Sequence, residues 1–395
     1  MALHRRVGLG LLVLYGVGVM VGAGIYVLVG KVAGVAGALT PLSFVVAGVA
    51  AALSALSFAE LSARIPESAG EAAYVRTAFG IGWLGDLVGI AVASVGVISA
   101  AAILKGGVGY LLAFVDLPRF WLEIMVGLLL GFVALVGVLE SLVFAAILTV
   151  VEVVGLLLIV GAGFSAEPVT PFADMVDFGS LFDGGAPLLL AAALLAFFAF
   201  IGFEDMVNLA EETLDPVRTM PRGIVGAIVI TTLLYFLVAV AAIRAVDTGL
   251  LAESERPLAL VFESGTGWSP DTIIVIAVSA TLNGVLAQIV MAARVLYGLG
   301  RRNRLLAWAH ATNDRLGTPV AATAVVTLII IVLALSAPIE DLAQVTTYIL
   351  LCIFVTVNVA LLVLKRRTAP PPGAPDIHWT VPVLAIGISL VLLIS

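Results

Sequence analysis

Charged side chains are scarce in this sequence of 395 residues: Asp, Glu, Lys and Arg make up 11%, while apolar types make up 62%. A soluble domain carries about 25% charged residues, so one water-soluble core could not hide this much apolar surface. Uncharged stretches of the length that crosses a bilayer as a helix, about 20 residues, lie at 7–30, 32–59, 272–293, 316–339 and 342–364. The composition predicts an all-α membrane protein.

Cysteine is almost absent. The one cysteine, Cys352, lies inside an apolar run and provides neither a disulfide framework nor a thiolate cluster for a metal. The three histidines (His4, His310 and His378) lack metal-ligand spacing. No span carries a Ser–His or HExxH arrangement, which argues against an intramembrane enzyme. We therefore expect no enzyme activity, no metal, no cofactor and no nucleic-acid partner.

The apolar runs predict eleven transmembrane helices. Their ranges are 7–33, 40–63, 83–110, 121–139, 142–164, 188–212, 223–246, 271–300, 318–336, 342–364 and 379–395. No polar segment between them exceeds about 25 residues, which leaves no room for a soluble catalytic domain. Any function must therefore lie within the helix bundle.

Basic residues are distributed unevenly between the two ends of these helices. With the N-terminus inside, 14 of the 19 Lys and Arg residues fall on inner segments. Cytoplasmic loops carry an excess of Lys and Arg, so the sequence predicts a multi-pass protein of the cell inner (cytoplasmic) membrane with a cytoplasmic N-terminus. Residues 166–187 contain acids but no Lys or Arg and are expected to form an outer loop between two halves.

The first predicted helix is rich in glycine. Four glycines fall within nine residues: Gly16, Gly18, Gly22 and Gly24. Each costs about 1 kcal/mol relative to alanine inside a helix, which favours local unwinding near mid-membrane. Unwinding would free backbone N–H groups from Gly22 onward, which suit a carboxylate. Close helix packing through small residues is the alternative explanation, and both remain open.

The sixth predicted helix has a second candidate break. Gly202 interrupts an aromatic run, and Glu204 and Asp205 follow within one turn. The aromatic residues are Phe197, Phe198, Phe200 and Phe203; core packing is their usual role, and the acids could mark the approach to the cytoplasmic interface. Helices 1 and 6 are, however, the first of two sets of five. Interrupted helices at corresponding positions of two halves indicate the substrate site of a transporter.

Several motifs, in order and at characteristic spacing, resemble the amino acid–polyamine–organocation superfamily. The similarity is to its bacterial and archaeal amino acid permeases and its cationic amino acid transporters, and it covers roughly residues 7–367. The motifs are Gly16–Tyr26, Ser57–Pro66 with Gly70 and Tyr74, Phe198–Glu204, Glu211 with Glu212, Pro216, Arg218, and Pro221 with Arg222.

The resemblance implies a leucine-transporter-type fold with broken helices 1 and 6. Two inverted five-helix repeats, 1–165 and 188–367, would be joined by the outer loop 166–187 and followed by an eleventh helix in 368–395. The family usually has twelve spans. In such proteins the substrate carboxylate meets backbone N–H groups of the first break, and the α-amine meets carbonyl groups of both breaks. The substrate-binding residues implied here are Met20, Gly22, Ala23, Gly24, Ile25, Phe198, Ala199, Ile201 and Gly202. Phe198 falls at the aromatic position that resembles a gate.

Glu152 lies at the centre of the fifth predicted helix, with no other charged residue between Glu140 and Glu167. A charge at the bilayer centre costs at least ~2.5–3.5 kcal/mol, so this carboxyl group needs a partner, water or a proton. An acid that ionises when the site opens would couple proton movement to conformation. A protonated acid bonded to a neighbouring helix is the structural alternative.

Some proton-coupled relatives have a lysine at a similar TxxK position of helix 5. Thr149 and Glu152 fit this spacing with the opposite charge, so the lysine mechanism does not carry over directly. Some relatives also have a glutamate implicated in proton-linked gating at a place similar to Glu204. The predicted ion-coupling residues are therefore Glu152 and Glu204, with Glu152 favoured.

Other polar residues have less specific expectations. Asp205 and the acids at 211, 212 and 215 are expected near the inner interface, in an ion-pair network or inner gate with Arg218 and Arg222. Glu60 and Asp86 are expected to pair with Arg64 and Arg76 or to reach toward the interface. A sodium site would use Ser279, Thr281 and Asn283, but hydroxyl groups in membrane helices often bond their own backbone.

The leading prediction is a secondary active transporter of amino acids, proton-coupled and working by alternating access, whose partners are the substrate, protons and the lipid bilayer. An ion-independent exchanger of amino acids or polyamines, with a structural Glu152, is the alternative. No phosphate-binding loop for direct ATP drive is present. Ala23 with Val19, Val95 and Val97 favours neutral or hydrophobic substrates, while Glu204 leaves cationic ones open. The oligomeric state is not defined by the sequence.

Overall fold

The computed structural model describes residues 7–21, 24–67, 70–136, 142–175, 185–300, 304–310 and 318–394. Regular structure within these ranges is helical, apart from one isolated β-bridge between Val7 and Thr213. The first half contains α1 (Leu9–Val21), α2 (Gly24–Ala36), η1 (Gly37–Leu39), α3 (Thr40–Arg64), α4 (Gly70–Phe79), α5 (Gly82–Leu111), α6 (Arg119–Val136), α7 (Leu142–Ser165) and α8 (Phe172–Met175).

The second half begins with a helix in three pieces. Its elements are α9 (Ala186–Phe197), η3 (Phe198–Phe200), η4 (Glu204–Leu209), α10 (Pro216–Ala245), α11 (Thr248–Glu253), α12 (Pro257–Thr266), α13 (Asp271–Gly300), η5 (Arg304–His310), α14 (Val320–Ser336), α15 (Ile339–Arg367) and α16 (Thr380–Leu393). The all-helical class predicted from the composition is confirmed.

Each of the eleven predicted spans coincides with a helix of the described ranges. Eight helical stretches are long and apolar enough to cross a membrane, and the shorter apolar helices are α1, α14 and α16. The largest boundary difference is at α10, which begins at Pro216 instead of residue 223. Proline suits the first turn of a helix because the N–H that it lacks would be unpaired there.

Apolar side chains face outward along several of these helices. On α6, Leu128, Leu129 and Phe132 are 57%, 59% and 63% exposed, and on α14 Leu328 is 62% exposed. Large exposed apolar surfaces mark contact with another apolar phase, and a bilayer core provides one around helices whose backbone bonds are internal. The chain is a multi-pass membrane protein.

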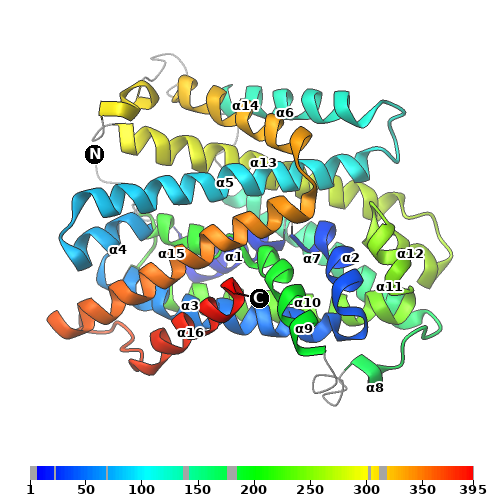
Figure 1. The fold of residues 1–395 in the computed structure, drawn as a ribbon, viewed down its shortest axis with the longest axis horizontal. Helices are drawn as coiled ribbons and strands as arrows, with labels where there is room; N and C mark the ends of the chain where they lie inside the picture. Colours follow the sequence, from blue (N-terminus) through cyan, green and yellow to red (C-terminus); the bar gives the residue numbers. More distant parts are fainter. Residues whose placement is uncertain are drawn as a thin grey trace.

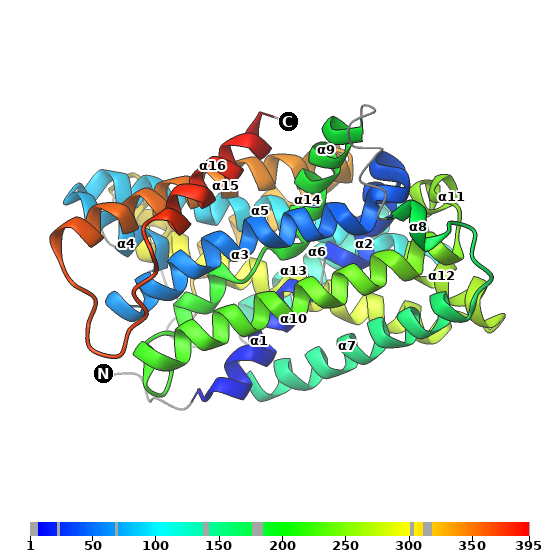
Figure 2. The ribbon, with the colours of Figure 1, turned by 90° about the horizontal axis from the view of Figure 1, so that it is seen from below.

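Long helices from the two halves pack against each other in pairs. In Figure 1, α5 runs beside α13, and α6 and α14 lie together along the same side of the molecule. α3 packs along α10, and Figure 2 shows this pair from below, with α7 at the edge beyond α10. The short helices α1, α2 and α9 are enclosed between these pairs, which places both interrupted helices inside the bundle.

Candidate functional site

The predicted first break falls in the two residues between α1 and α2. α1 ends at Val21 and α2 begins at Gly24, while Gly22 and Ala23, two of the predicted carboxylate ligands, lie outside the described residues. A Cβ atom on Gly24 would overlap the backbone of Ala199 in the second break. Glycine at position 24 therefore lets the two breaks touch.

The remaining glycines of the first helix serve close packing. A Cβ atom on Gly16 would collide with Met206, and one on Gly18 with the side chain of Thr149. The close-packing explanation thus holds for Gly16 and Gly18, while unwinding from Gly22 onward stays a prediction. Gly16 and Gly18 bring α1 against η4 and α7, and Gly24 borders the break.

The second break is centred on Ile201 and Gly202. Ile201 has extended backbone angles (φ −59°, ψ 134°) after the 3₁₀ turn η3, and Gly202 has φ +117°. Glycine adopts this left-handed region far more readily than other residues, so the glycine at position 202 determines where the helix stops. A Cβ atom on Gly202 would overlap Val19, which makes this the second place where the breaks meet.

Tyr235 of α10 connects the two breaks. Its hydroxyl group lies 2.7 Å from the carbonyl oxygen of Met20 and 2.9 Å from that of Ala199, and the residue is fully buried. One hydroxyl carries one proton, so it donates to these two acceptors in turn or shares the proton between them. Both carbonyl groups are among those predicted to receive the substrate amine. Tyr235 is not among the residues predicted from the sequence, because nothing in the pattern of α10 distinguishes it from other polar residues such as Thr231 and Thr232.

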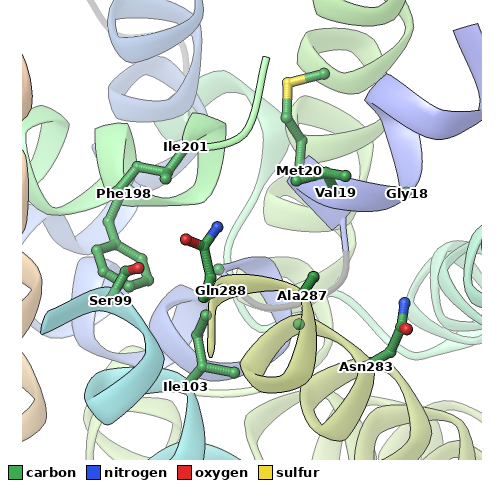
Figure 3. A pocket seen from close by; sticks show the side chains of 12 residues that line it. Gly18, Val19, Met20, Ser99, Ile103, Phe198, Ile201, Asn283, Ala287 and Gln288 are labelled. Carbon is green, nitrogen blue, oxygen red and sulfur yellow. The ribbon is translucent and has the colours of Figure 1, made fainter. Parts of the chain in front are cut away.

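A small cavity of about 40 Å³ lies where the breaks face α5 and α13. Figure 3 shows Phe198 and Ile201 on one side, Val19 and Met20 on another, and Gln288 rising between them from α13. The lining residues are Gly18, Val19, Met20, Gly24, Ser99, Ile103, Phe198, Ile201, Asn283, Gly284, Ala287 and Gln288.

The predicted substrate residues divide into two groups around this cavity. Met20, Gly24, Phe198 and Ile201 line it, whereas Ile25, Ala199 and Gly202 are buried behind these residues. Of the four valine and alanine residues expected to shape the pocket, Val19 lines it and Ala23 lies outside the described residues. α5 contributes Ser99 and Ile103 in place of Val95 and Val97.

The cavity lining carries no charge among the described residues. Its polar side chains are Ser99, Asn283 and Gln288, and none of its members is acidic or basic. The hydroxyl of Ser99 donates to the carbonyl of Gly96 in its own helix, at 3.1 Å. An uncharged wall that excludes water disfavours a ligand whose side chain carries an unpaired charge.

Most aromatic residues around the second break form core. Phe203 packs against Phe58 and Phe354 with ring centroids 5.6 and 5.2 Å apart, and Phe197 lies 6.0 Å from Phe354. Phe198 differs, because its ring borders the cavity. The core-packing interpretation therefore applies to Phe197 and Phe203, and the pocket-lining interpretation to Phe198.

Glu204 and Asp205 are both buried, at 4% and 7% exposure. The N–H of Gly202 donates to Glu204 Oε2 at 3.0 Å, so this carboxylate caps the backbone at its own break. Gln288 Nε2 donates to Asp205 Oδ2 at 3.4 Å. Of the two roles expected for Asp205, the ion pair with Arg218 or Arg222 is not found among the described contacts, because η4 turns this side chain into the bundle toward Gln288; the inner-gate role stays a prediction.

The ion pair found in the segment that follows is at the surface. Arg218 Nε lies 3.9 Å from Asp215 Oδ2, with both side chains more than half exposed. Exposed pairs of this kind contribute little to stability. Glu60 and Asp86 behave as expected: Glu60 lies 2.7 Å from Arg64, and Asp86 lies 2.9 Å from Arg76.

Glu152 stands apart from the cavity on α7. Its side chain is 2% exposed, and neither carboxyl oxygen has a hydrogen-bond partner among the described atoms. Tyr26 donates to the backbone carbonyl of Glu152 at 3.0 Å, not to the carboxyl group. Within the described structure, this acid is therefore buried without the compensation that a charge requires.

The candidate sodium ligands Thr281 and Asn283 are not arranged as a cation site requires. Thr281 donates to the carbonyl oxygens of Ala277 and Val278 in its own helix, at 2.9 and 3.0 Å, as expected for a hydroxyl in a membrane helix. Asn283 borders the cavity. A cation needs several converging oxygen atoms, and this hydroxyl is occupied by backbone.

α4 packs beneath the second break. A Cβ atom on Gly70 would meet Val207 and Asn208 of η4, and the next residue, Glu71, is 4% exposed. Burial raises the pKa of Glu71 from 4.5 to about 8, and the charge of Asp205 acts in the same direction. The sequence analysis did not identify Glu71, because nothing in its local pattern shows that this short helix is covered.

The opposite end of the bundle is tied by ion pairs. Lys31 of α2 lies 3.1 Å from Glu340 of α15 and donates to the carbonyl of Ala252 in α11 at 3.0 Å. Arg119 of α6 pairs with Glu255, which precedes α12. These contacts hold the α11–α12 segment against α2, α6 and α15.

A family model described as "Amino acid permease" matches residues 11–395. Cationic amino acid transporter 1 of Arabidopsis thaliana is 29% identical over 231 residues, which are 58% of this chain and 38% of the plant protein. An uncharacterized transporter of Mycobacterium tuberculosis is 32% identical over 322 residues, 80% of this chain and 71% of that protein.

Branched-chain amino acid permease BcaP of Bacillus subtilis is 29% identical over 229 residues, 57% of this chain and 47% of that protein. The chain therefore spans between 38% and 71% of the length of these relatives. All of them are named as transporters or permeases, and none as an enzyme.

Proposed function

We propose that this chain, which belongs to the amino acid permease family, moves amino acids across the cytoplasmic membrane as a secondary active transporter by alternating access. The observation that carries the proposal is the meeting of two interrupted helices at one cavity, with Gly24 against Ala199 and Gly202 against Val19. Backbone without helical partners is tolerated at membrane depth only where it lines a cavity or is buried in protein.

The order of elements supports two repeats, 1–165 and 188–367, of leucine-transporter type. Each begins with an interrupted helix, and each has short helices between its second and third long ones: α4 in the first, and α11 with α12 in the second. The second long helices, α3 and α10, pack together, as do the third, α5 and α13. The segment 166–187, of which 176–184 lie outside the described residues, would join the repeats, and α16 would follow in 368–395.

The breaks supply both kinds of group that an amino acid needs. The α-carboxylate would take backbone N–H groups of Gly22 to Ile25, at the start of α2, where the helix dipole favours an anion. The α-amine would take carbonyl groups of Met20, Phe198, Ala199 and Ile201. Tyr235 already holds two of these carbonyl groups, so an arriving ammonium would compete with its hydroxyl and loosen its link between the breaks.

The uncharged lining favours a neutral amino acid. A cationic side chain inside the cavity would need a carboxylate, and the acids nearest to it, Glu204 and Asp205, are engaged by Gly202 and Gln288. Among the relatives, this preference resembles that named for the branched-chain permease more than that named for the cationic transporters.

Proton coupling is the favoured energy source, with Glu152 as the coupling acid and Glu204 as the rival. Among the described residues, Glu152 lacks a hydrogen-bond partner for its carboxyl group, whereas Glu204 has one. In the alternative, Glu152 is structural and the protein exchanges amino acids or polyamines without an ion.

Uptake by purified protein in liposomes tests these proposals. A panel of labelled amino acids would be offered to empty vesicles with the outside acidified, with a sodium gradient, and with no gradient, and to vesicles preloaded with substrate. Accumulation driven by acid outside supports proton symport. Uptake only into preloaded vesicles supports the exchanger. No uptake of any amino acid under any condition overturns the proposed function.

A further inference from the structure

Gln288 of α13 joins the cavity to one of the acids beneath it. It lines the cavity, its Nε2 donates to Asp205 Oδ2 at 3.4 Å, and it is 5% exposed. Figure 3 shows its amide between Ile201 and Met20, in the middle of the labelled residues. Gln288 therefore connects α13, on which it lies, to η4, the piece of the second interrupted helix that follows the break.

Gln288 lies at the cytoplasmic end of the cavity in the orientation proposed above. Of the lining residues on α13 it is the closest to Gly300, the end of the helix opposite the α12 connection. Its Oε1 lies close to Gly96: a Cβ atom added to this glycine would be 3.0 Å from the oxygen. Gly96 is one turn nearer than Ser99 to the start of α5, the end joined to α4. The amide thus spans the floor of the cavity, from α5 to η4.

The bond that holds this floor is poised to break. Gln288 Oε1 has no hydrogen-bond partner among the described residues, and an unpaired buried acceptor disfavours the closed arrangement. The bond from Nε2 to Asp205, at 3.4 Å, lies beyond the usual range for N–H···O contacts. Water entering from below would satisfy both groups at once. The closed floor is therefore held by a weak polar contact whose partners gain new bonds on opening.

We propose that the Gln288–Asp205 hydrogen bond is the latch that closes the inner end of the cavity, and that Gln288 is a positioning residue for release of substrate to the cytoplasm. The proposal rests on the proposed function for the direction of transport. Opening separates α13 from η4, breaks the one bond from Nε2, and leaves the amide and the carboxylate to water.

Thiol accessibility tests the latch without requiring transport. Cys352 is replaced by serine, and Ser99→Cys, on the cavity wall, becomes the only thiol. Reconstituted protein is exposed to a membrane-impermeant thiol reagent from the cytoplasmic side, and the modification rate is measured in this common background. We expect Gln288→Met, which keeps the size of the side chain and removes both polar groups, to speed modification by about two- to tenfold, as for loss of one ordinary hydrogen bond.

Two further variants separate a latch from general loosening. Asp205→Asn keeps an acceptor oxygen for Gln288, so its rate should stay closer to the parent than to Gln288→Met. Ser94→Ala removes a partly exposed hydroxyl of α5 that donates to the carbonyl of Ile90 in its own helix and lies outside the cavity lining, and it should leave the rate unchanged. Equal rates in Gln288→Met and the parent, or equal acceleration by Ser94→Ala, would overturn the latch.

A folding defect in one variant does not end the test. Asp205→Ala removes the same bond from the other side, so it should accelerate modification as Gln288→Met does, and a folded Asp205→Ala with the parent rate contradicts the proposal. Amino acid uptake is measured on the same vesicles. Accelerated modification without any uptake leaves the latch and rejects the proposed function, whereas uptake without acceleration does the reverse.

Discussion

Buried acids in this protein are held in two different ways. Glu204 accepts a hydrogen bond from Gly202, and Asp205 accepts one from Gln288, so each carboxylate fixes part of the second break. Glu152 on α7 is as deeply buried, yet neither of its carboxyl oxygens has a partner in the described structure. A carboxyl group without a hydrogen-bond partner can gain or lose a proton without breaking a bond of the site. This difference supports the proposal that Glu204 and Asp205 position the second break, whereas Glu152 carries the coupling proton.

Among the variants that test this difference between the buried acids, Glu152→Gln should have the largest effect on uptake. The substitution keeps shape and removes the proton that the carboxyl group would carry, so accumulation driven by acid outside should be lost completely while substrate binding survives. Liposome uptake with an imposed pH gradient measures the first, and substrate-dependent thermal stabilisation the second. Unchanged pH dependence would remove Glu152 from the mechanism.

Glu71→Gln tests the buried acids of α4 and η4 by their effect on the free energy of unfolding. Burial raises the pKa of Glu71 to about 8 from 4.5, so the folded protein keeps a proton that the unfolded chain releases. Stability from this group is complete below about pH 4.5 and declines as the pH rises toward 8. Glu204 and Asp205 on η4 and Tyr74 on α4 interact electrostatically with Glu71.

The amide variant should therefore gain up to a few kcal/mol over the parent at pH 8 and little at pH 4.5. Thermal unfolding in detergent across this pH range measures the difference. A parent and variant with parallel pH profiles would show that Glu71 does not contribute to the decline.

Tyr235→Phe examines the link between the breaks, with Tyr110→Phe as its matched control. Tyr235 bonds carbonyl groups of both breaks, whereas Tyr110 donates to the carbonyl of Tyr26 at 2.7 Å. Each variant should lose about 1–2 kcal/mol of stability, since a buried acceptor is left unpaired. Substrate affinity should change only for Tyr235→Phe; an equal change in both would contradict a specific role at the breaks.

Glu204→Gln should have the smallest effect. Its amide oxygen still accepts from the N–H of Gly202, so the break keeps its cap and the loss should be less than about 1 kcal/mol. Uptake should remain driven by acid outside. If pH-driven uptake vanished here and persisted in Glu152→Gln, the roles assigned to the two acids would be exchanged.

Most of the fold was predictable because each membrane helix is a long apolar run that can be recognised from its own residues. Uncharged runs marked the spans, and the glycines at 24 and 202 marked the ends of helix pieces, since both positions exclude a Cβ atom. The pieces of the site that lie on the interrupted helices, such as Met20 and Phe198, followed from the same local signals together with the family resemblance.

The rest of the site depends on contacts between distant segments. Tyr235 and Gln288 lie in mainly apolar helices that also carry other polar residues, such as Thr231 and Asn283, so local sequence does not show which of these side chains reach the breaks. An ion pair of Asp205 with Arg218 or Arg222 was expected because these basic residues follow it in the sequence, whereas η4 turns its side chain inward to Gln288. Which face of a short 3₁₀ turn is covered cannot be read from that turn alone.

Simultaneous measurement of amino acid and proton movement tests the central claim most directly. Liposomes containing a pH-sensitive dye would receive labelled neutral amino acid outside with no imposed pH gradient, for the parent protein and for Glu152→Gln. We predict that the lumen acidifies as substrate enters through the parent protein, and that Glu152→Gln shows no substrate-linked acidification. Substrate entry through the parent protein without any change in internal pH would contradict proton-coupled transport.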